Sequence, residues 1–263
     1  MKDKPVLFID SGIGGIPYCK DFIKNNPHES VYYLADKKNF PYGPRKKEEI
    51  TSILTSIMDK FLINTDPKIA VLACNTATVS AVSALREIFP QIPFVGTVPA
   101  LKPAAGAGGK IGILATERTI EEISSLRLID ETCEITGICA PELVEFIEKN
   151  FDQAGEKEKR ETAKKYLDMF RKKNVNTLVL GCTHFLYLLE EFQKEAYPSI
   201  IVFDSIAGIT KRIEYLLDEN NLRAQKDSKA GYRLLLTGDE TEDAIWRERA
   251  LKLGFELFYF DKS

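Results

Sequence analysis

Residues 70–82 read AVLACNTATVSAV, and residues 178–189 read LVLGCTHFLYLL. Each stretch begins with a short, uninterrupted apolar run that leads through a small residue to a cysteine. After each cysteine come polar residues typical of a helix start and then an apolar helical pattern. An uninterrupted apolar run of this length is typical of a strand buried on both faces of a parallel sheet. The two stretches therefore predict an α/β protein with two similar halves, each carrying one cysteine at a strand end.

The rest of the chain repeats this alternation of strand and helix. The strand candidates are Val6–Ile9, Val31–Leu34, Ile69–Ala73, Phe94–Gly96, Ile111–Ala115, Glu134–Ile138, Thr177–Leu180, Ile200–Phe203, Arg233–Leu236 and Glu256–Phe260. Amphipathic helical patterns cover Lys46–Phe61, Val79–Phe89, Glu156–Lys172 and Glu240–Leu251. We expect two similar α/β domains with mostly parallel central sheets covered by helices. The active site is expected at the carboxyl ends of strands, in the cleft between the domains.

Two crossings between these domains are visible in the composition. Residues 97–110, TVPALKPAAGAGGK, are rich in Pro, Gly and Ala, which is typical of a connection. A second crossing falls near residues 204–208, after which the chain returns for its last two strands. We therefore expect a discontinuous first domain, residues 1–97 plus 207–263, and a second domain of residues 98–206.

Composition excludes several classes of protein. Apolar residues make up 44% of the chain, which is enough to bury a core. The 36 Lys and Arg against 39 Asp and Glu give a net charge of -3, which disfavours non-specific nucleic-acid binding. No apolar run is long enough to span a membrane, and the start, MKDKPVLFIDSG, lacks the apolar region of a secretory signal. We expect a cytoplasmic protein that binds neither nucleic acid nor membrane.

Cofactor and metal motifs are also missing. The five cysteines are irregularly spaced without C-x-x-C, so neither a disulfide framework nor a redox motif is indicated. With only two histidines, His28 and His184, a site with several histidine ligands is excluded. GIGG at residues 12–15 is not a dinucleotide fingerprint, and GAGGK at residues 106–110 is not a P-loop. No lysine motif for pyridoxal phosphate is evident, so we expect no cofactor and no metal.

Cys74 and Cys182 are the chief candidates for chemistry. At a strand end beside a helix N-terminus, backbone N–H groups and the helix dipole lower the pKa of a thiol. The alternative is that each is a small buried apolar residue, as most free cysteines are. Two cysteines in matching contexts favour the functional interpretation. The remaining cysteines, Cys19, Cys133 and Cys139, lack this context.

Three further features leave a functional and a structural interpretation open. Asp10 follows the first strand, where it could act as an acid–base partner, bind an ammonium group or cap the next helix. His184 lies two residues after Cys182 and could polarise the thiol, bind a carboxylate or simply pack. The turn Pro41-Tyr42-Gly43 could offer a hydroxyl and an amide to a ligand, or could be a plain turn.

Eight blocks in sequence order resemble the glutamate racemase family, within the wider aspartate/glutamate racemase superfamily. The blocks, which run from residue 8 to residue 239, are FIDSGIGG, NFPYGPRKKE, VLACNTAT, PFVGTVPALKPA, GILAT, LVLGCTHF, FDSIAG and LLLTGD. The GCTH form of the second cysteine block is similar to the glutamate enzymes, because aspartate racemases typically have Glu in place of His184. The resemblance therefore covers nearly the whole chain.

This resemblance implies cofactor-independent racemisation of glutamate by a two-base mechanism, with Cys74 and Cys182 as catalytic acid and base. It implies that Asp10 assists Cys74 and that His184 assists Cys182. Glu148 matches a family glutamate near the second cysteine, although its block, APELVEFIEKN, has Glu145 where Pro is common. The implied substrate-binding residues are Asp10, Ser11, Pro41, Tyr42, Gly43, Asn75, Thr76, Thr116, Thr119, Thr183 and His184.

The resemblance also implies a bacterial cytoplasmic enzyme that supplies D-glutamate for peptidoglycan synthesis and forms a homodimer. A racemase of aspartate, a hydantoin or a malonate with the same two-cysteine chemistry is the nearest alternative. A thiol redox protein is disfavoured by the missing C-x-x-C spacing. A non-catalytic binding module is disfavoured by the presence of both cysteines.

Overall fold

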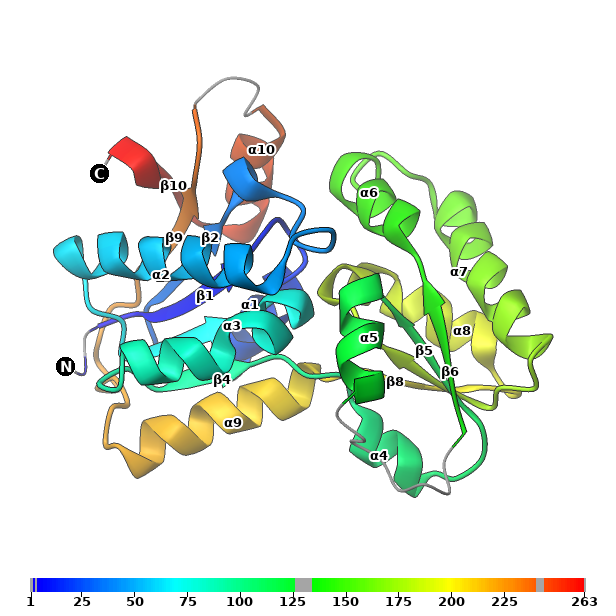
Figure 1. Cartoon of the computed structure of the whole chain (residues 1–263). Coiled ribbons are helices and arrows are strands. Elements are labelled where there is room, and N and C mark those ends of the chain that lie inside the picture. The colour runs from blue at the N-terminus through cyan, green and yellow to red at the C-terminus, as the bar shows by residue number, and fades with distance from the viewer. Residues whose placement is uncertain (1, 3, 126–133, 240–243, 263) are drawn as a thin grey trace. The chain divides into compact units, whose positions relative to one another are not determined.

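The computed structural model describes residues 2, 4–125, 134–239 and 244–262, and the chain divides into two compact units (Figure 1). The first unit comprises Met1–Thr97 and Ile206–Ser263, and the second comprises Val98–Ser205. Each unit has its own parallel sheet flanked by helices. The predicted fold class, α/β with parallel sheets covered by helices, is confirmed.

The first unit is built on a six-stranded sheet in the order β10-β9-β2-β1-β3-β4, in which every pair is parallel. Its strands are β1 (Val6–Asp10), β2 (Val31–Ala35), β3 (Ile69–Leu72), β4 (Phe94–Gly96), β9 (Tyr232–Leu236) and β10 (Glu256–Tyr259). Its helices are α1 (Ile16–Asn25), η1 (Lys37–Asn39), α2 (Lys47–Asn64), α3 (Asn75–Ile88), α9 (Ile206–Glu219), α10 (Ala244–Leu253) and η3 (Phe260–Lys262).

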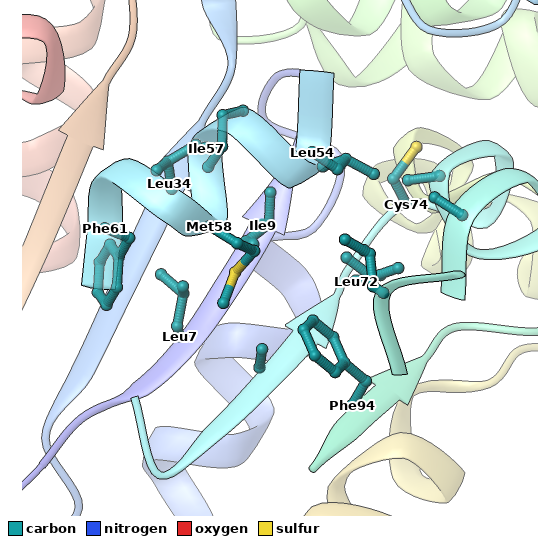
Figure 2. Close-up of a cluster of buried hydrophobic side chains, with 14 of the residues drawn as sticks. Leu7, Ile9, Leu34, Leu54, Ile57, Met58, Phe61, Leu72, Cys74 and Phe94 are labelled. Carbon is teal, nitrogen blue, oxygen red and sulfur yellow. The ribbon is translucent and has the colours of Figure 1, made fainter. Parts of the chain in front are cut away.

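Both faces of this sheet are buried. Leu7 and Ile9 of β1 pack with residues of α2 and α3 in the cluster that Figure 2 shows. Phe8, between them, points to the opposite face, where its ring centroid lies 5.8 Å from that of Phe22 in α1. A strand that packs on both faces needs apolar residues at every position, which explains the uninterrupted apolar runs in the sequence.

The second unit contains a four-stranded parallel sheet in the order β6-β5-β7-β8. Its strands are β5 (Ile111–Ala115), β6 (Ile135–Cys139), β7 (Thr177–Leu180) and β8 (Ile201–Phe203). Its helices are α4 (Leu101–Gly106), α5 (Glu117–Ser125), α6 (Pro141–Lys149), α7 (Glu156–Arg171), η2 (Thr183–Leu188) and α8 (Leu189–Ala196).

This smaller sheet is also covered on both faces. Ile111 and Ile113 of β5 pack with Leu101 of α4 in one buried cluster. Gly112, between them, faces α7, and a Cβ atom there would lie 2.6 Å from the ring of Phe170. The absence of a side chain at Gly112 therefore allows Phe170 of α7 to pack directly against strand β5.

The ten predicted strands all occur, each with ends within one residue of the expected ones. Two helix starts differ from the prediction. Helix α3 begins at Asn75 rather than Val79, because Cys74 itself takes the N-cap position. After Cys182 the chain first forms the 3₁₀ helix η2, a common form for a short helical start. Cys133 and the first four residues of the expected helix Glu240–Leu251 lie outside the described residues.

A buried ion pair joins distant segments of the first unit. The side chains of Lys68 and Glu29 form a salt bridge and are only 1% and 4% exposed. Lys68 Nζ also donates to the carbonyl of Leu222 at 3.1 Å, and the Ala224 N–H donates to Glu29 Oε1 at 2.9 Å. The pair therefore anchors the segment after α9 to the amino end of β3.

We expect Glu29→Gln to lower the free energy of unfolding by about 3–5 kcal/mol, because it leaves the Lys68 charge buried without its counterion. The exposed pair of Lys4 and Asp66 is the control, and Asp66→Asn should cost less than about 1 kcal/mol. Urea unfolding at neutral pH measures both. Equal losses for the two variants would contradict the structural importance of the buried pair.

Candidate active site

The carboxyl ends of the first sheet bring several polar residues to one edge, because all its strands run parallel. Backbone hydrogen bonds continue the strand ladders past these ends. The Asp36 N–H donates to the Asp10 carbonyl at 2.8 Å, and the Ala73 N–H donates to the Ile9 carbonyl at 2.8 Å. Asp10, Asp36 and the Ala73-Cys74 pair therefore lie at the ends of three adjacent strands, β1, β2 and β3.

Cys74 occupies the N-cap position of α3, with φ -137° and ψ 121°. Its side chain is buried, and Figure 2 shows it at one end of the core cluster, near Leu54 and Leu72. Asn75 and Thr76, expected as capping residues, instead form the first helical turn and are both buried. The thiol therefore lies at the helix N-terminus, where unsatisfied N–H groups and the helix dipole favour negative charge.

Asp10 ends β1 and is fully buried. Its Oδ1 accepts a hydrogen bond of 2.7 Å from the backbone N–H of Gly12, so the carboxylate folds back over the loop that follows the strand. Helix α1 starts later, with Gly15 as its N-cap, so Asp10 is not a helix cap. Ser11 beside it is also buried.

Asp36 anchors the turn that contains Pro41, Tyr42 and Gly43. Its carboxylate accepts hydrogen bonds of 2.6 Å from the Tyr42 hydroxyl and 2.6 Å from the Thr237 hydroxyl. Tyr42 is buried, Gly43 is half-buried and Pro41 is exposed. The turn is thus tied into the sheet edge rather than being an independent surface loop.

The surroundings of the Tyr42 hydroxyl keep it protonated. Burial raises the pKa of Tyr42 well above 10.0, and the charge of Asp36 and its hydrogen bond raise it further, followed by Cys74 and Asp10. The Tyr42 hydroxyl is thus close enough to Cys74 and Asp10 for their charges to affect its pKa. Asp36 was missed by the sequence-based prediction, although an aspartate directly after a strand was the signal that singled out Asp10.

Cys182 repeats the backbone setting of Cys74 in the second unit. It follows β7 as the N-cap of η2, with φ -134° and ψ 136°, and is also buried. The preceding Gly181 N–H donates to the Leu114 carbonyl of β5 at 2.7 Å, which continues the ladder between these strands. Thr183 and His184, the next two residues, are buried at the start of the 3₁₀ helix.

His184 lies between a sulfur and a carboxylate. Its Nδ1 is 3.8 Å from Cys182 Sγ, and its Nε2 is 2.7 Å from Oε1 of Glu148 on α6. Burial alone lowers the pKa of His184, but the hydrogen bonds to Cys182 and Glu148 and the Glu148 charge outweigh it and raise the pKa well above 6.5. In the imidazolium form both ring nitrogens donate, which suits these two partners.

The other predicted residues of the second unit lie at the end of β5. The hydroxyls of Thr116 and Thr119 are 3.0 Å apart, with Thr116 directly after the strand and Thr119 fully buried. Since β5 pairs with β7, Thr116 follows the strand adjacent to the one that carries Cys182. The described residues contain no group of three or more His, Cys, Asp or Glu side chains arranged to hold a metal ion.

The cysteines outside these settings differ from Cys74 and Cys182. Cys19 is buried within α1, and burial raises the pKa of its thiol. Cys139 is exposed at the end of β6, and partial burial followed by the charge of Glu117 raises the pKa of its thiol. His28 is exposed in the loop after α1. Within the described part of the chain, no helix is both long and apolar enough to cross a membrane.

Comparison with known proteins identifies the family. Residues 21–212 match the family model for Asp/Glu/Hydantoin racemase. The chain is 32% identical over 246 residues to a glutamate racemase from Clostridium novyi. The aligned region covers 92% of this chain and 94% of the relative. The crystal structure of Escherichia coli glutamate racemase in complex with L-glutamate and the activator UDP-MurNAc-Ala matches with a TM-score of 0.83 and 28% identity, covering 97% of each chain.

A second solved structure matches over the full length. Glutamate racemase from Francisella tularensis, in complex with D-glutamate, has a TM-score of 0.79 and 26% identity, covering 100% of both chains. The expected resemblance is thereby confirmed. The chain belongs to the Asp/Glu/Hydantoin racemase family and is an isomerase of the amino-acid racemase class.

Proposed function

We propose that this enzyme interconverts L-glutamate and D-glutamate without a cofactor, using Cys74 and Cys182 as the two acid–base groups. The observation that carries the proposal is the equivalent placement of the two thiols. Each follows a buried interior strand of its sheet and takes the N-cap position of the next helix, and His184 Nδ1 lies 3.8 Å from Cys182 Sγ. Relatives that hold L-glutamate or D-glutamate support the choice of substrate.

The reaction needs one group on each face of the α-carbon. The thiolate of one cysteine removes the α-proton and becomes a thiol, while the electron pair stays on the α-carbon and spreads into its carboxylate. The thiol of the other cysteine then donates its proton to the opposite face and becomes a thiolate. The enzyme ends each turnover with the two roles exchanged, ready for the reverse reaction. This scheme requires both units to present their thiols to the same substrate molecule.

We assign Asp10 to the Cys74 side and His184, held by Glu148, to the Cys182 side. Asp10 ends the strand adjacent to β3, and an imidazolium 3.8 Å from Cys182 stabilises a thiolate at that sulfur. Proton transfer of this kind contributes only about two to four orders of magnitude in rate. Buried hydroxyls, amides and helix N-termini lie where the strands of both sheets end. They supply polar groups for the two carboxylates and the ammonium group of glutamate.

The predicted binding residues complete this proposal. In the first unit they are Ser11, Pro41, Tyr42, Gly43, Asn75 and Thr76, and in the second they are Thr116, Thr119, Thr183 and His184. We further propose that the enzyme supplies D-glutamate for peptidoglycan in a bacterial cytoplasm and works as a homodimer. We also propose that the expected domains, residues 1–97 plus 207–263 and residues 98–206, form its two functional halves.

Substrate choice separates this proposal from its nearest alternative, a racemase of aspartate or of a hydantoin. We expect kcat/KM for L-glutamate to exceed that for L-aspartate by at least about 100-fold, because a site built for the longer side chain leaves buried polar groups unpaired with the shorter one. Circular dichroism of the amino acid follows both reactions. A preference for aspartate would overturn the assignment of glutamate while leaving the two-cysteine chemistry intact.

The two-base scheme predicts that Cys74→Ala and Cys182→Ala each abolish racemisation, with losses of at least about 100-fold, while both variants stay folded. The reason is that inversion needs an acid and a base on opposite faces. In heavy water we expect one-sided exchange of the α-proton, without inversion, from the enantiomer whose proton the remaining cysteine can reach.

Cys139→Ala is the matched control, because this exposed thiol ends a strand without taking a helix N-cap. It should retain the activity of the wild-type enzyme. Full racemase activity in either Cys74→Ala or Cys182→Ala would overturn the two-base scheme. Far-ultraviolet circular dichroism and melting temperatures check that the variants are folded.

Glu148→Gln tests the arrangement around His184. Removing the carboxylate charge 2.7 Å from Nε2 should lower the pKa of His184. Because folding raises this pKa, the charged histidine stabilises the wild-type fold fully below about pH 6.5, and this contribution is lost as the pH rises through the folded-state pKa. The variant should therefore lose more stability at pH 6 than at high pH.

Two-dimensional ¹H–¹³C NMR of the imidazole rings follows the protonation of His184 directly. Urea unfolding at several pH values measures the stability of the wild-type protein and of Glu148→Gln. The chain has only two histidines, so the exposed His28 provides a second resonance in the same spectra. An unchanged titration of His184 in Glu148→Gln would contradict the role assigned to Glu148.

A further inference from the structure

Tyr33 carries a buried hydroxyl in the middle of β2, next to β1 in the first sheet. The residue pairs in register with Phe8 of β1 and is only 1% exposed. Its hydroxyl donates to the Gly12 carbonyl at 2.8 Å and accepts from the Gly15 N–H at 3.1 Å. The same hydroxyl therefore holds both ends of the glycine loop between β1 and α1.

This loop also carries the contact to Asp10. The Gly12 N–H donates to Asp10 Oδ1 at 2.7 Å, so the two backbone groups of Gly12 are held by Asp10 on one side and by Tyr33 on the other. Loss of the Tyr33 hydroxyl would release the Gly12 carbonyl. The backbone that orients the Asp10 carboxylate would then be free to shift.

Gly15 links the same loop to the strand that bears Cys74. A Cβ atom on Gly15 would lie 2.5 Å from Ala73 Cβ and 3.1 Å from the Tyr33 hydroxyl oxygen. The amino end of α1 therefore rests directly on Ala73, the residue before Cys74. Through Gly12 and Gly15, one hydroxyl contacts both the loop of Asp10 and the backbone that packs on the Cys74 strand end.

We propose that Tyr33 is a positioning residue that sets the geometry of Asp10 relative to Cys74. The inference rests on the proposed racemisation and on the assignment of Asp10 to Cys74. Tyr33 acts through the loop backbone and does not itself exchange a proton with the substrate. A misplacement of reacting groups by about 1 Å costs on the order of 100-fold in rate, so the loss of this hydroxyl has a measurable effect.

The test compares Tyr33→Phe with Tyr32→Phe. Both changes remove one hydroxyl from β2, but the ring of Tyr32 packs against Phe61, away from the glycine loop. We expect Tyr33→Phe to lower kcat about 10- to 100-fold, with a smaller change in KM. Tyr32→Phe should retain the wild-type kinetics.

Primary isotope effects distinguish positioning from general damage. Each enantiomer of glutamate is prepared with deuterium at the α-carbon, and the isotope effect on racemisation is measured from both directions. If Tyr33→Phe slows only the proton transfers that involve Cys74, the primary isotope effect should rise for the enantiomer whose α-proton Cys74 removes. The effect should fall for the other enantiomer, because reprotonation by Cys74 then limits the rate. A smaller fraction of folded enzyme would change neither value.

A double variant checks that Tyr33 acts through Asp10. In the presence of Asp10→Asn, the change Tyr33→Phe should have little further effect on the isotope effects. If the wild-type enzyme racemises glutamate but Tyr33→Phe has unchanged isotope effects, the inference is overturned and the proposed function stands. If the wild-type enzyme does not racemise glutamate, the proposed function fails and the inference fails with it.

Discussion

The structure depends on one constraint, which is the placement of a small polar side chain where a buried parallel strand ends and a helix begins. The strand must be apolar on both faces, and the next backbone N–H groups must point toward the strand end. Cys74 and Cys182 both meet this constraint, with nearly the same extended backbone angles at the N-cap. The fold therefore produces the same chemical setting twice from two different sheets.

The side chains around the two thiols differ, although their backbone settings agree. On the Cys182 side a buried imidazole lies between the sulfur and the Glu148 carboxylate, and the pKa of His184 rises as a result. On the Cys74 side, Asp10 ends the strand next to β3, and its carboxylate accepts a hydrogen bond from the Gly12 N–H. In the proposed two-base scheme each thiol serves as acid in one direction and as base in the other, so the fold supports the two roles with different side chains.

Much of the fold could be predicted because two-sided burial leaves a direct mark in the sequence. Strand β5 (IGILA) and strand β7 (TLVL, apolar after its first residue) carry this mark, and their ends were predicted correctly. Asp36 and Tyr33 were missed, because their roles depend on partners that only the folded chain supplies. Thr237, which donates to Asp36, lies 201 residues away in the sequence. The Tyr33 hydroxyl contacts the loop that follows the neighbouring strand β1. Glu148 was assigned from family resemblance, since a glutamate on an amphipathic helix carries no signal of its own.

The most direct test of two-base racemisation follows the first turnovers of the wild-type enzyme in heavy water. Starting from protiated L-glutamate, D-glutamate should carry deuterium at its α-carbon from the beginning, because its new proton comes from a cysteine that exchanges with solvent. The unreacted L-glutamate should stay protiated at early times. Appearance of deuterium in both enantiomers at the same initial rate, or return of the original proton to the product, would contradict a mechanism with one cysteine on each face.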